Sequence, residues 1–176
     1  LTVDTTNTNM YCSGFTSHVL RLIVLSSADV TTFAGTADSG GSTDGTGAAA
    51  RFYQPRGSVF TASTTPLYLC DQSNHRIRAV TTPGAAVTTW AGPSGVASSG
   101  FADGTGTTGV KFKYPYDAAF DATNAAMFIS DRDNYRIRKA TVPGAVVTSP
   151  LGNGTNAVLD GVGTSAQFQN VYSITI

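Results

Sequence analysis

The chain repeats itself, and this repetition limits what it can fold into. The sequence Val-Thr-Thr-Phe-Ala-Gly at 30–35 returns as Val-Thr-Thr-Trp-Ala-Gly at 87–92 and, more distantly, as Val-Thr-Ser-Pro-Leu-Gly at 147–152. A second pattern, Asp-Gln-Ser-Asn-His-Arg-Ile-Arg at 71–78, returns as Asp-Arg-Asp-Asn-Tyr-Arg-Ile-Arg at 131–138. The first pattern returns after 57 residues and again after 60, and the second pattern returns after 60. Tandem units bury their apolar faces against their neighbours, so we expect a repeat scaffold on which function must be sought.

Composition excludes some classes of function. The 176 residues are 41% hydrophobic, which suffices for one sizeable core. Eleven basic and 11 acidic residues give a formal net charge of 0, so the chain lacks the basic character typical of nucleic-acid binding. No apolar run approaches the roughly 20 residues that span a bilayer, and no membrane insertion is expected.

The surface composition favours a location outside the cell or at the cell surface, with the cytoplasm as the alternative. Charged residues make up only 12% of the chain, and Thr, Ser, Gly and Ala fill the stretches between apolar runs. Asn153, in the triplet Asn-Gly-Thr, is a candidate glycosylation site in a Gly-rich loop. In a chain this rich in Thr, such a triplet also arises by chance.

Short apolar runs bounded by turn residues predict strands, and no window shows a long helical period. Val, Ile, Thr and aromatic residues fill these runs, as is typical of a pleated surface. The expected strands are 1–4, 9–13, 18–25 and 29–34 in the first unit, 57–62, 66–71, 75–81 and 85–91 in the second, and 117–121, 126–131, 135–141 and 145–150 in the third. Four antiparallel strands per unit, with a long link to the next unit, predict an all-β fold of β-propeller blades.

The motifs that recur around these strands resemble the NHL repeat family of β-propellers. The stretch Asn-His-Arg-Ile-Arg at 74–78 is similar to the signature of that family. An Asp-Gly-x-Gly segment lies before the second unit, before the third unit and before residues 171–176, at 44–47, 103–106 and 160–163. Tyr135 departs from the family, which has His at this position, and the first unit has lost both Asp and Asn from its turn.

We therefore expect residues 1–176 to form a single segment of an NHL-type propeller. The predicted blades cover about 1–35, 57–92 and 117–152, and a strand at 171–176 would begin a further blade. Propellers typically need 4–8 blades to close, and the resemblance implies six. The chain is then an excerpt of a longer propeller, half of a ring made by two copies, or one subunit of an open polymer.

One rim of such a propeller carries both the turns between the second and third strands and the long loops 36–56, 93–115 and 152–170. Long loops on rigid strands are where binding residues usually lie. The candidate binding residues on this rim are Asp71, Asn74, Asp131, Asn134, Asp44, Asp103 and Asp160. Because they recur from unit to unit, the favoured alternative is that they hold tight turns by bonding local backbone.

Four arginines recur in the same way and are predicted to be structural. Arg76, Arg78, Arg136 and Arg138 are expected to lie across blade edges and to pair with carboxylates.

The sequence predicts no catalytic residues, no metal site and no cofactor. His18 and His75 are the only histidines, so a zinc site would need ligands from elsewhere. One Asp in each Asp-Gly-x-Gly loop is too few for calcium. Cys12 and Cys70 fall in opposite register on neighbouring blades, so both thiols face the shared interface or both face away from it. Packed sheets lie about 10 Å apart, which favours two buried free thiols over a disulfide.

Three hypotheses for function follow. The first is a non-enzymatic interaction or structural module that contacts protein or glycan and partners other proteins or further copies of itself. The second, implied by the resemblance, is a fragment of an NHL-type lyase or hydrolase with an axial metal site in the complete ring. The third is a nucleic-acid-binding NHL domain, which the net charge disfavours.

Overall fold

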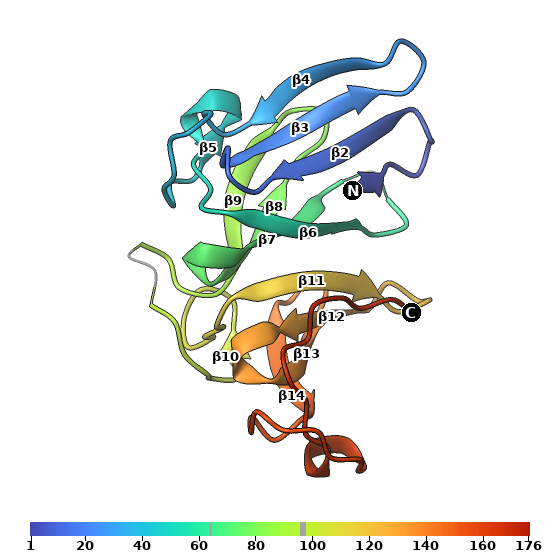
Figure 1. Ribbon diagram of the computed structural model, residues 1–176. Coiled ribbons are helices and arrows are strands. Elements are labelled where there is room, and N and C mark those ends of the chain that lie inside the picture. The colour runs from blue at the N-terminus through green and yellow to red at the C-terminus, as the bar shows by residue number, and fades with distance from the viewer. Residues whose placement is uncertain (64, 96–97) are drawn as a thin grey trace.

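The chain folds into three antiparallel sheets that stack face to face as the blades of a partial β-propeller (Figure 1). The computed structural model describes residues 1–63, 65–95 and 98–176. Within these residues the helical segments are short 3-10 turns, and none is long and apolar enough to cross a membrane. The alternation of apolar and polar residues, which favours strands over helices, therefore determines the fold class.

Each blade has four main strands, close to the predicted bounds. Blade 1 comprises β1 (Thr2–Val3), β2 (Asn9–Gly14), β3 (Val19–Val24) and β4 (Asp29–Ala34). Blade 2 comprises β6 (Pro55–Phe60), β7 (Leu67–Asp71), β8 (Arg76–Val80) and β9 (Ala86–Ala91). Blade 3 comprises β11 (Pro115–Phe120), β12 (Ala126–Asp131), β13 (Arg136–Thr141) and β14 (Val146–Leu151).

Blades 2 and 3 each carry a fifth strand that the sequence did not predict. The two-residue strands β5 (Gly45–Thr46) and β10 (Gly104–Thr105) belong to the Asp-Gly-Thr-Gly segments. They pair with β9 and β14, so each lies at the outer edge of the blade that follows it in the chain. The long links therefore run from one blade across the outer edge of the next before entering its inner strand, β6 or β11.

Two apolar layers hold the blades together. Between blades 1 and 2, Tyr11 and Leu20 pack in one cluster with Leu69 and Val80. Between blades 2 and 3, a second cluster includes the following buried side chains: Tyr68, Cys70, Ile77, Met127, Ile129 and Val147. Since strand side chains alternate between faces, blade 2 contributes one set to each layer and is covered on both sides.

The inner strands β6 and β11 lie side by side (Figure 1), and a glycine allows their close approach. A Cβ atom added at Gly57 would lie 2.7 Å from the Cα atom of Asp117. No side chain fits there without moving backbone, so Gly57 fixes how tightly blades 2 and 3 converge at the centre.

The prediction of a strand at 171–176 is wrong, although this segment occupies the predicted place. It lies along β11, where Ser173 Oγ donates to Asp117 Oδ2 at 3.0 Å and the rings of Tyr172 and Tyr116 meet edge to face. Among the described residues, no strand pairs with this segment, and its backbone forms no ladder of hydrogen bonds.

Candidate functional site

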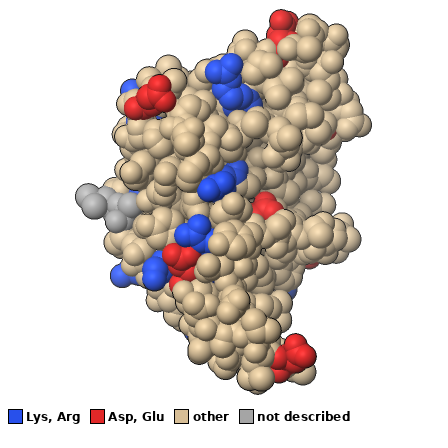
Figure 2. All heavy atoms as spheres, viewed as in Figure 1, with Lys and Arg blue, Asp and Glu red and all other residues tan. Residues whose placement is uncertain are grey.

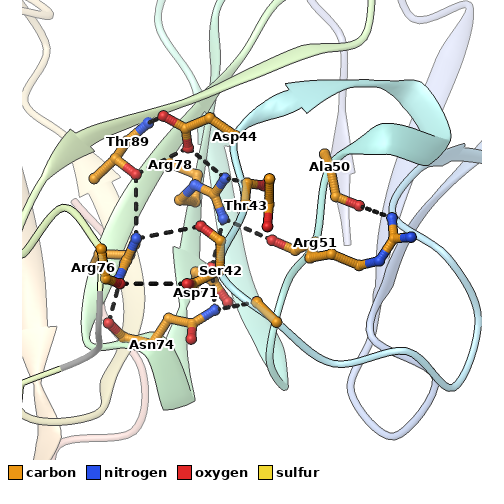
Figure 3. A network of polar contacts seen from close by, with 12 residues as sticks. Ser42, Thr43, Asp44, Ala50, Arg51, Asp71, Asn74, Arg76, Arg78 and Thr89 are labelled. Carbon is orange, nitrogen blue, oxygen red and sulfur yellow. Dashed lines mark hydrogen bonds and ion pairs between the residues drawn. The ribbon is translucent and has the colours of Figure 1, made fainter.

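A buried ion-pair network ties loop 36–56 to blade 2, which follows it in the chain (Figure 3). The Arg78 side chain is fully buried and donates to Asp71 Oδ2 at 2.8 Å and to Asp44 Oδ1 at 2.7 Å. It also donates to the carbonyl oxygens of Arg51 (2.9 Å) and Thr43 (3.0 Å). One guanidinium thus joins β7, β8 and loop 36–56.

Blade 3 repeats this network at the equivalent positions. Arg138 donates to Asp131 (2.7 Å), Asp103 (2.9 Å) and the carbonyl oxygens of Lys111 (2.9 Å) and Ala102 (2.7 Å). Burial raises the pKa of Asp131 to about 6, against the opposing effect of Arg138, and burial likewise raises the pKa of Asp71. Repetition in successive blades and full burial both indicate that this network is structural and fixes where each loop meets the blade.

The structure corrects the prediction of a binding site at these carboxylates. The carboxyl groups of Asp71 and Asp131 are 0% exposed and have no open side toward a ligand. They also bond beyond their own turns, because Asp71 Oδ1 accepts the N–H of Tyr53 at 2.8 Å and Asp131 Oδ1 accepts that of Lys113 at 2.7 Å. Local turn backbone is therefore not their main partner.

The neighbouring Asn side chains also hold the loops. Asn74 Nδ2 donates to the Gly41 carbonyl at 2.6 Å and to Asp71 at 2.8 Å, and Asn134 makes the equivalent bonds to Gly100 and Asp131. The loop 93–115, also predicted to lie on the rim, contains residues 96 and 97, which lie outside the described residues.

The other two arginines bond oxygens that carry no charge, contrary to the prediction of carboxylate partners. Arg76 donates to the carbonyl oxygen of Gly95 at 2.7 Å, and Arg136 to those of Gly152 at 3.0 Å and Asn153 at 2.5 Å. Burial lowers the pKa of both guanidinium groups. Asn153 itself is exposed, as glycosylation would require.

Each histidine links its blade to the segment that enters the next blade through one hydrogen bond. His75 adopts the left-handed conformation (φ 57°), and its Nδ1 accepts the N–H of Tyr114 at 3.2 Å. His18 accepts the N–H of Gln54 at 3.1 Å in the same way. Burial lowers the pKa of His75, which keeps Nδ1 available as an acceptor.

A pocket of about 400 Å³ lies where the inner strands begin, and the sequence did not predict it. Arg56, Tyr116 and Tyr172 occupy equivalent positions in β6, β11 and the segment 171–176, and all three line the pocket. Phe15, Gln72 and Arg132 occupy equivalent positions in the turns between the second and third strands. We call the surface formed by these six residues the axial mouth.

Arg56 contacts residues of both sets, from the inner strands and from the turns. Its guanidinium carbon lies 3.7 Å from the ring centroid of Phe15 and 4.8 Å from that of Tyr116, while its Nε donates to Gln72 Oε1 at 3.2 Å. Arg132 lies 5.9 Å from the Tyr116 centroid and is paired with Asp133 at 2.6 Å. The axial mouth is therefore an array of aromatic rings and guanidinium groups held in fixed orientations.

The axial mouth differs in kind from the ion-pair network. The network uses the same residue types in blades 2 and 3, as the fold demands. The axial mouth has Arg, Tyr and Tyr in one set and Phe, Gln and Arg in the other. Because the fold tolerates different side chains at these positions, they are free to serve recognition. Comparing the repeats for differences as well as for sameness would have found them.

Two further kinds of site would be a metal centre among the described residues and a basic surface on the face that Figure 2 shows. Among residues 1–63, 65–95 and 98–176, no three His, Cys, Asp or Glu side chains cluster so as to hold a metal ion. On the face shown in Figure 2, Lys and Arg are scattered among uncharged residues.

The stacked blades, with a pocket where their inner strands begin, define the chain as a segment of a β-propeller. No model of a known protein family matches it. It is 26% identical over 161 residues to Protein SUPPRESSOR OF QUENCHING 1, chloroplastic, of Arabidopsis thaliana, covering 92% of this chain and 15% of that protein.

Solved structures support the same assignment. An auxiliary nutrient binding protein from Bacteroides thetaiotaomicron is 27% identical, with a TM-score of 0.67 over 82% of this chain and 35% of that one. A protein of unknown function from the same organism is 18% identical, with a TM-score of 0.74 over 98% of this chain and 40% of that one. The chain thus spans well under half of each of these relatives.

Proposed function

We propose that the chain is part of a non-enzymatic, NHL-type binding scaffold that takes its ligand at the axial mouth. The proposal rests on one observation. Residue types differ between equivalent positions of the axial mouth, whereas the buried ion-pair network has the same residue types in blades 2 and 3. The likeness to an auxiliary nutrient binding protein supports a binding role. With the low charge content, it also supports a location outside the cell or at its surface, where Asn153 would be open to glycosylation.

A screen of soluble glycans and peptides by ligand-observed NMR tests this proposal. Tyr116→Ala removes the ring at the centre of the axial mouth and should abolish binding of the hits. Tyr53→Ala is the matched control, because Tyr53 is an exposed rim tyrosine outside the pocket. Hits that bind both variants equally would contradict the assignment of the site. Turnover of a screened compound, or a stoichiometric bound metal, would favour the enzyme hypothesis instead.

We further propose that another blade of the same type covers the open face of blade 1. On this face Val30 is 50% exposed and Ile23 is half-buried. Their equivalents in blade 2, Val87 and Val80, are 1% and 0% exposed because blade 1 covers them. An apolar face of this kind is typical of a surface that packs against another protein element.

The C-terminal part of the chain also supports packing against a further blade. Asp160 is equivalent to Asp44 and Asp103, each of which pairs with an arginine of the following blade. Asp160 is exposed and has no partner among the described residues. The covering blade could belong to a longer polypeptide or to a second copy, and sedimentation equilibrium separates these: dimers or larger species support a second copy, and a stable monomer contradicts it.

A further inference from the structure

We infer that the axial mouth binds a ligand in which a single carboxylate is attached to a ring. This inference rests on the proposed function and specifies the chemistry of the ligand. Arg56, which lines the pocket, would supply the charge, and the surrounding aromatic residues would contact the ring.

The orientation of Arg56 is fixed by the protein while its hydrogen-bonding edge stays open. Its Nε donates to Gln72, and its guanidinium lies over the rings of Phe15 and Tyr116. Its two terminal nitrogens have no hydrogen-bond or ion-pair partner among the described residues. A guanidinium held in this way presents parallel N–H groups that match the two oxygens of a carboxylate.

The charges in the pocket favour one carboxylate over a phosphate. Asp117 also lines the pocket, but its Oδ1 accepts the N–H of Ala118 at 3.0 Å and its Oδ2 accepts the hydroxyl of Ser173 at 3.0 Å. Its charge is thus stabilised by donors of the protein itself, and it would repel a second negative charge. Arg132 is already paired with Asp133. Arg56 is the one basic side chain among the described residues that line the pocket. A single cation matches a monoanion, whereas a phosphate carries a charge of about −1.5 to −2 at neutral pH.

The aromatic residues that line the pocket suit the ring of a cyclic ligand. Phe15, Tyr116 and Tyr172 line the pocket together with Arg56, and Tyr172 is 52% exposed, so part of its ring is accessible to a ligand. A volume of about 400 Å³ lies within the usual range for sites that take small molecules. Two sources offer this chemistry: a uronic acid unit of a glycan and an aromatic carboxylic acid.

Isothermal titration calorimetry with matched pairs of probes tests the inference. The pairs are D-glucuronic acid with D-glucose and benzoate with benzyl alcohol, and inorganic phosphate is a separate probe. We expect the carboxylate of one pair to bind at least about tenfold more tightly than its neutral partner, as a charge-assisted hydrogen bond should allow. The pair that shows the difference identifies the source.

Variants then test the role assigned to Arg56. Arg56→Gln should remove the preference for the carboxylate, and Arg56→Lys should restore little of it because an ammonium lacks the planar fork. Arg51→Gln is the matched control, since Arg51 lies outside the pocket and donates to the carbonyl oxygens of Ala48 and Ala50. Circular dichroism and thermal unfolding would confirm that each variant is folded.

Three results would overturn the inference. These are equal binding of a neutral probe and its carboxylate, stronger binding of phosphate than of either carboxylate, and a carboxylate preference that survives Arg56→Gln. None of them would overturn the proposed function if binding of the probes still depended on Tyr116. Loss of that dependence would contradict both.

Discussion

Arg78 on β8 and Asp44 in loop 36–56 form an ion pair 2.7 Å long that fastens the loop to the outer part of blade 2. The same arginine bonds the fully buried carboxylate of Asp71 at 2.8 Å. One side chain therefore secures both the turn and the loop that lie beside the axial mouth. Since the axial mouth depends on where these segments lie, the network supports the proposed site without touching its ligand.

Replacing Arg78 should be strongly destabilising. Arg78→Met leaves the carboxylate of Asp71 buried without its cation, and removal of one member of a buried pair typically costs about 3–5 kcal/mol. Adding Asp71→Asn removes the unpaired charge, so the double variant should be less destabilised than the single one. Urea unfolding followed by circular dichroism measures both. A single variant as stable as the wild type would show that the pair contributes nothing.

Gly57 should not tolerate a side chain. Gly57→Ala places a Cβ 2.7 Å from the Cα atom of Asp117, so β6 and β11 must move apart, and overpacking of this kind typically costs about 1–3 kcal/mol. Asp117→Ala should not rescue the variant, because the closest unyielding contact is with backbone. Gly84→Ala is the control: among the described residues, its Cβ would meet the Thr81 hydroxyl alone, at 3.3 Å. The measurement is the free energy of unfolding, and equal values for the two glycine variants would contradict the prediction.

His75 should make stability depend on pH near its titration. Burial lowers the pKa of His75 below its ordinary value of 6.5, so the folded state binds its proton less readily than the unfolded chain does. Its contribution is therefore fully present above pH 6.5 and declines as the pH falls through 6.5 toward the lowered pKa. Protonation also removes the acceptor for the Tyr114 N–H.

The variant His75→Asn isolates this contribution, because Asn tolerates the left-handed conformation and does not titrate. Between pH 7.5 and 5 the wild type should lose more stability than the variant. Asp131 acts in the opposite sense: its pKa is raised to about 6, so its contribution is lost as the pH rises through 6. This term is common to both proteins and cancels in the comparison. Parallel pH profiles would contradict the role given to His75.

The sequence predicted the blades well because they repeat and alternate. The predicted strand 126–131 coincides with β12, and 29–34 with β4. The strands β5 and β10 escaped prediction because two residues show no periodicity. The segment 171–176 was predicted as a strand from its alignment with earlier repeats, but a strand also needs a partner, which sequence alignment does not reveal.

The candidate site was predicted less well, for a physical reason. The sequence pattern selected residues that recur, and recurrence marks what every blade needs, as the burial of Asp71 and Asp131 shows. Arg56 and Tyr116 stand at equivalent positions but differ in chemistry, so a search for sameness passed over them. Their convergence at one pocket becomes visible only once the inner strands lie side by side.

The two cysteines should differ sharply in reactivity. They are free, as predicted, but only Cys70 is buried. Tyr11 faces blade 2, so its neighbour Cys12 lies on the opposite, open face of blade 1. Cys70 packs in the layer between blades 2 and 3, and burial raises its pKa well above the ordinary value. The thiolate, which is the reactive form, is thus disfavoured at Cys70.

A thiol reagent such as 5,5′-dithiobis(2-nitrobenzoic acid) should therefore label one cysteine of the native protein quickly and the second only in denaturant. Cys12→Ser should remove the fast phase, and Cys70→Ser should leave it intact. Fast labelling of Cys70 in the native protein would contradict its burial between the blades. If a second copy covers the face of blade 1, the fast phase should also slow as protein concentration rises, because association hides Cys12. A rate independent of concentration over the range in which sedimentation detects dimers would exclude that face from the dimer contact.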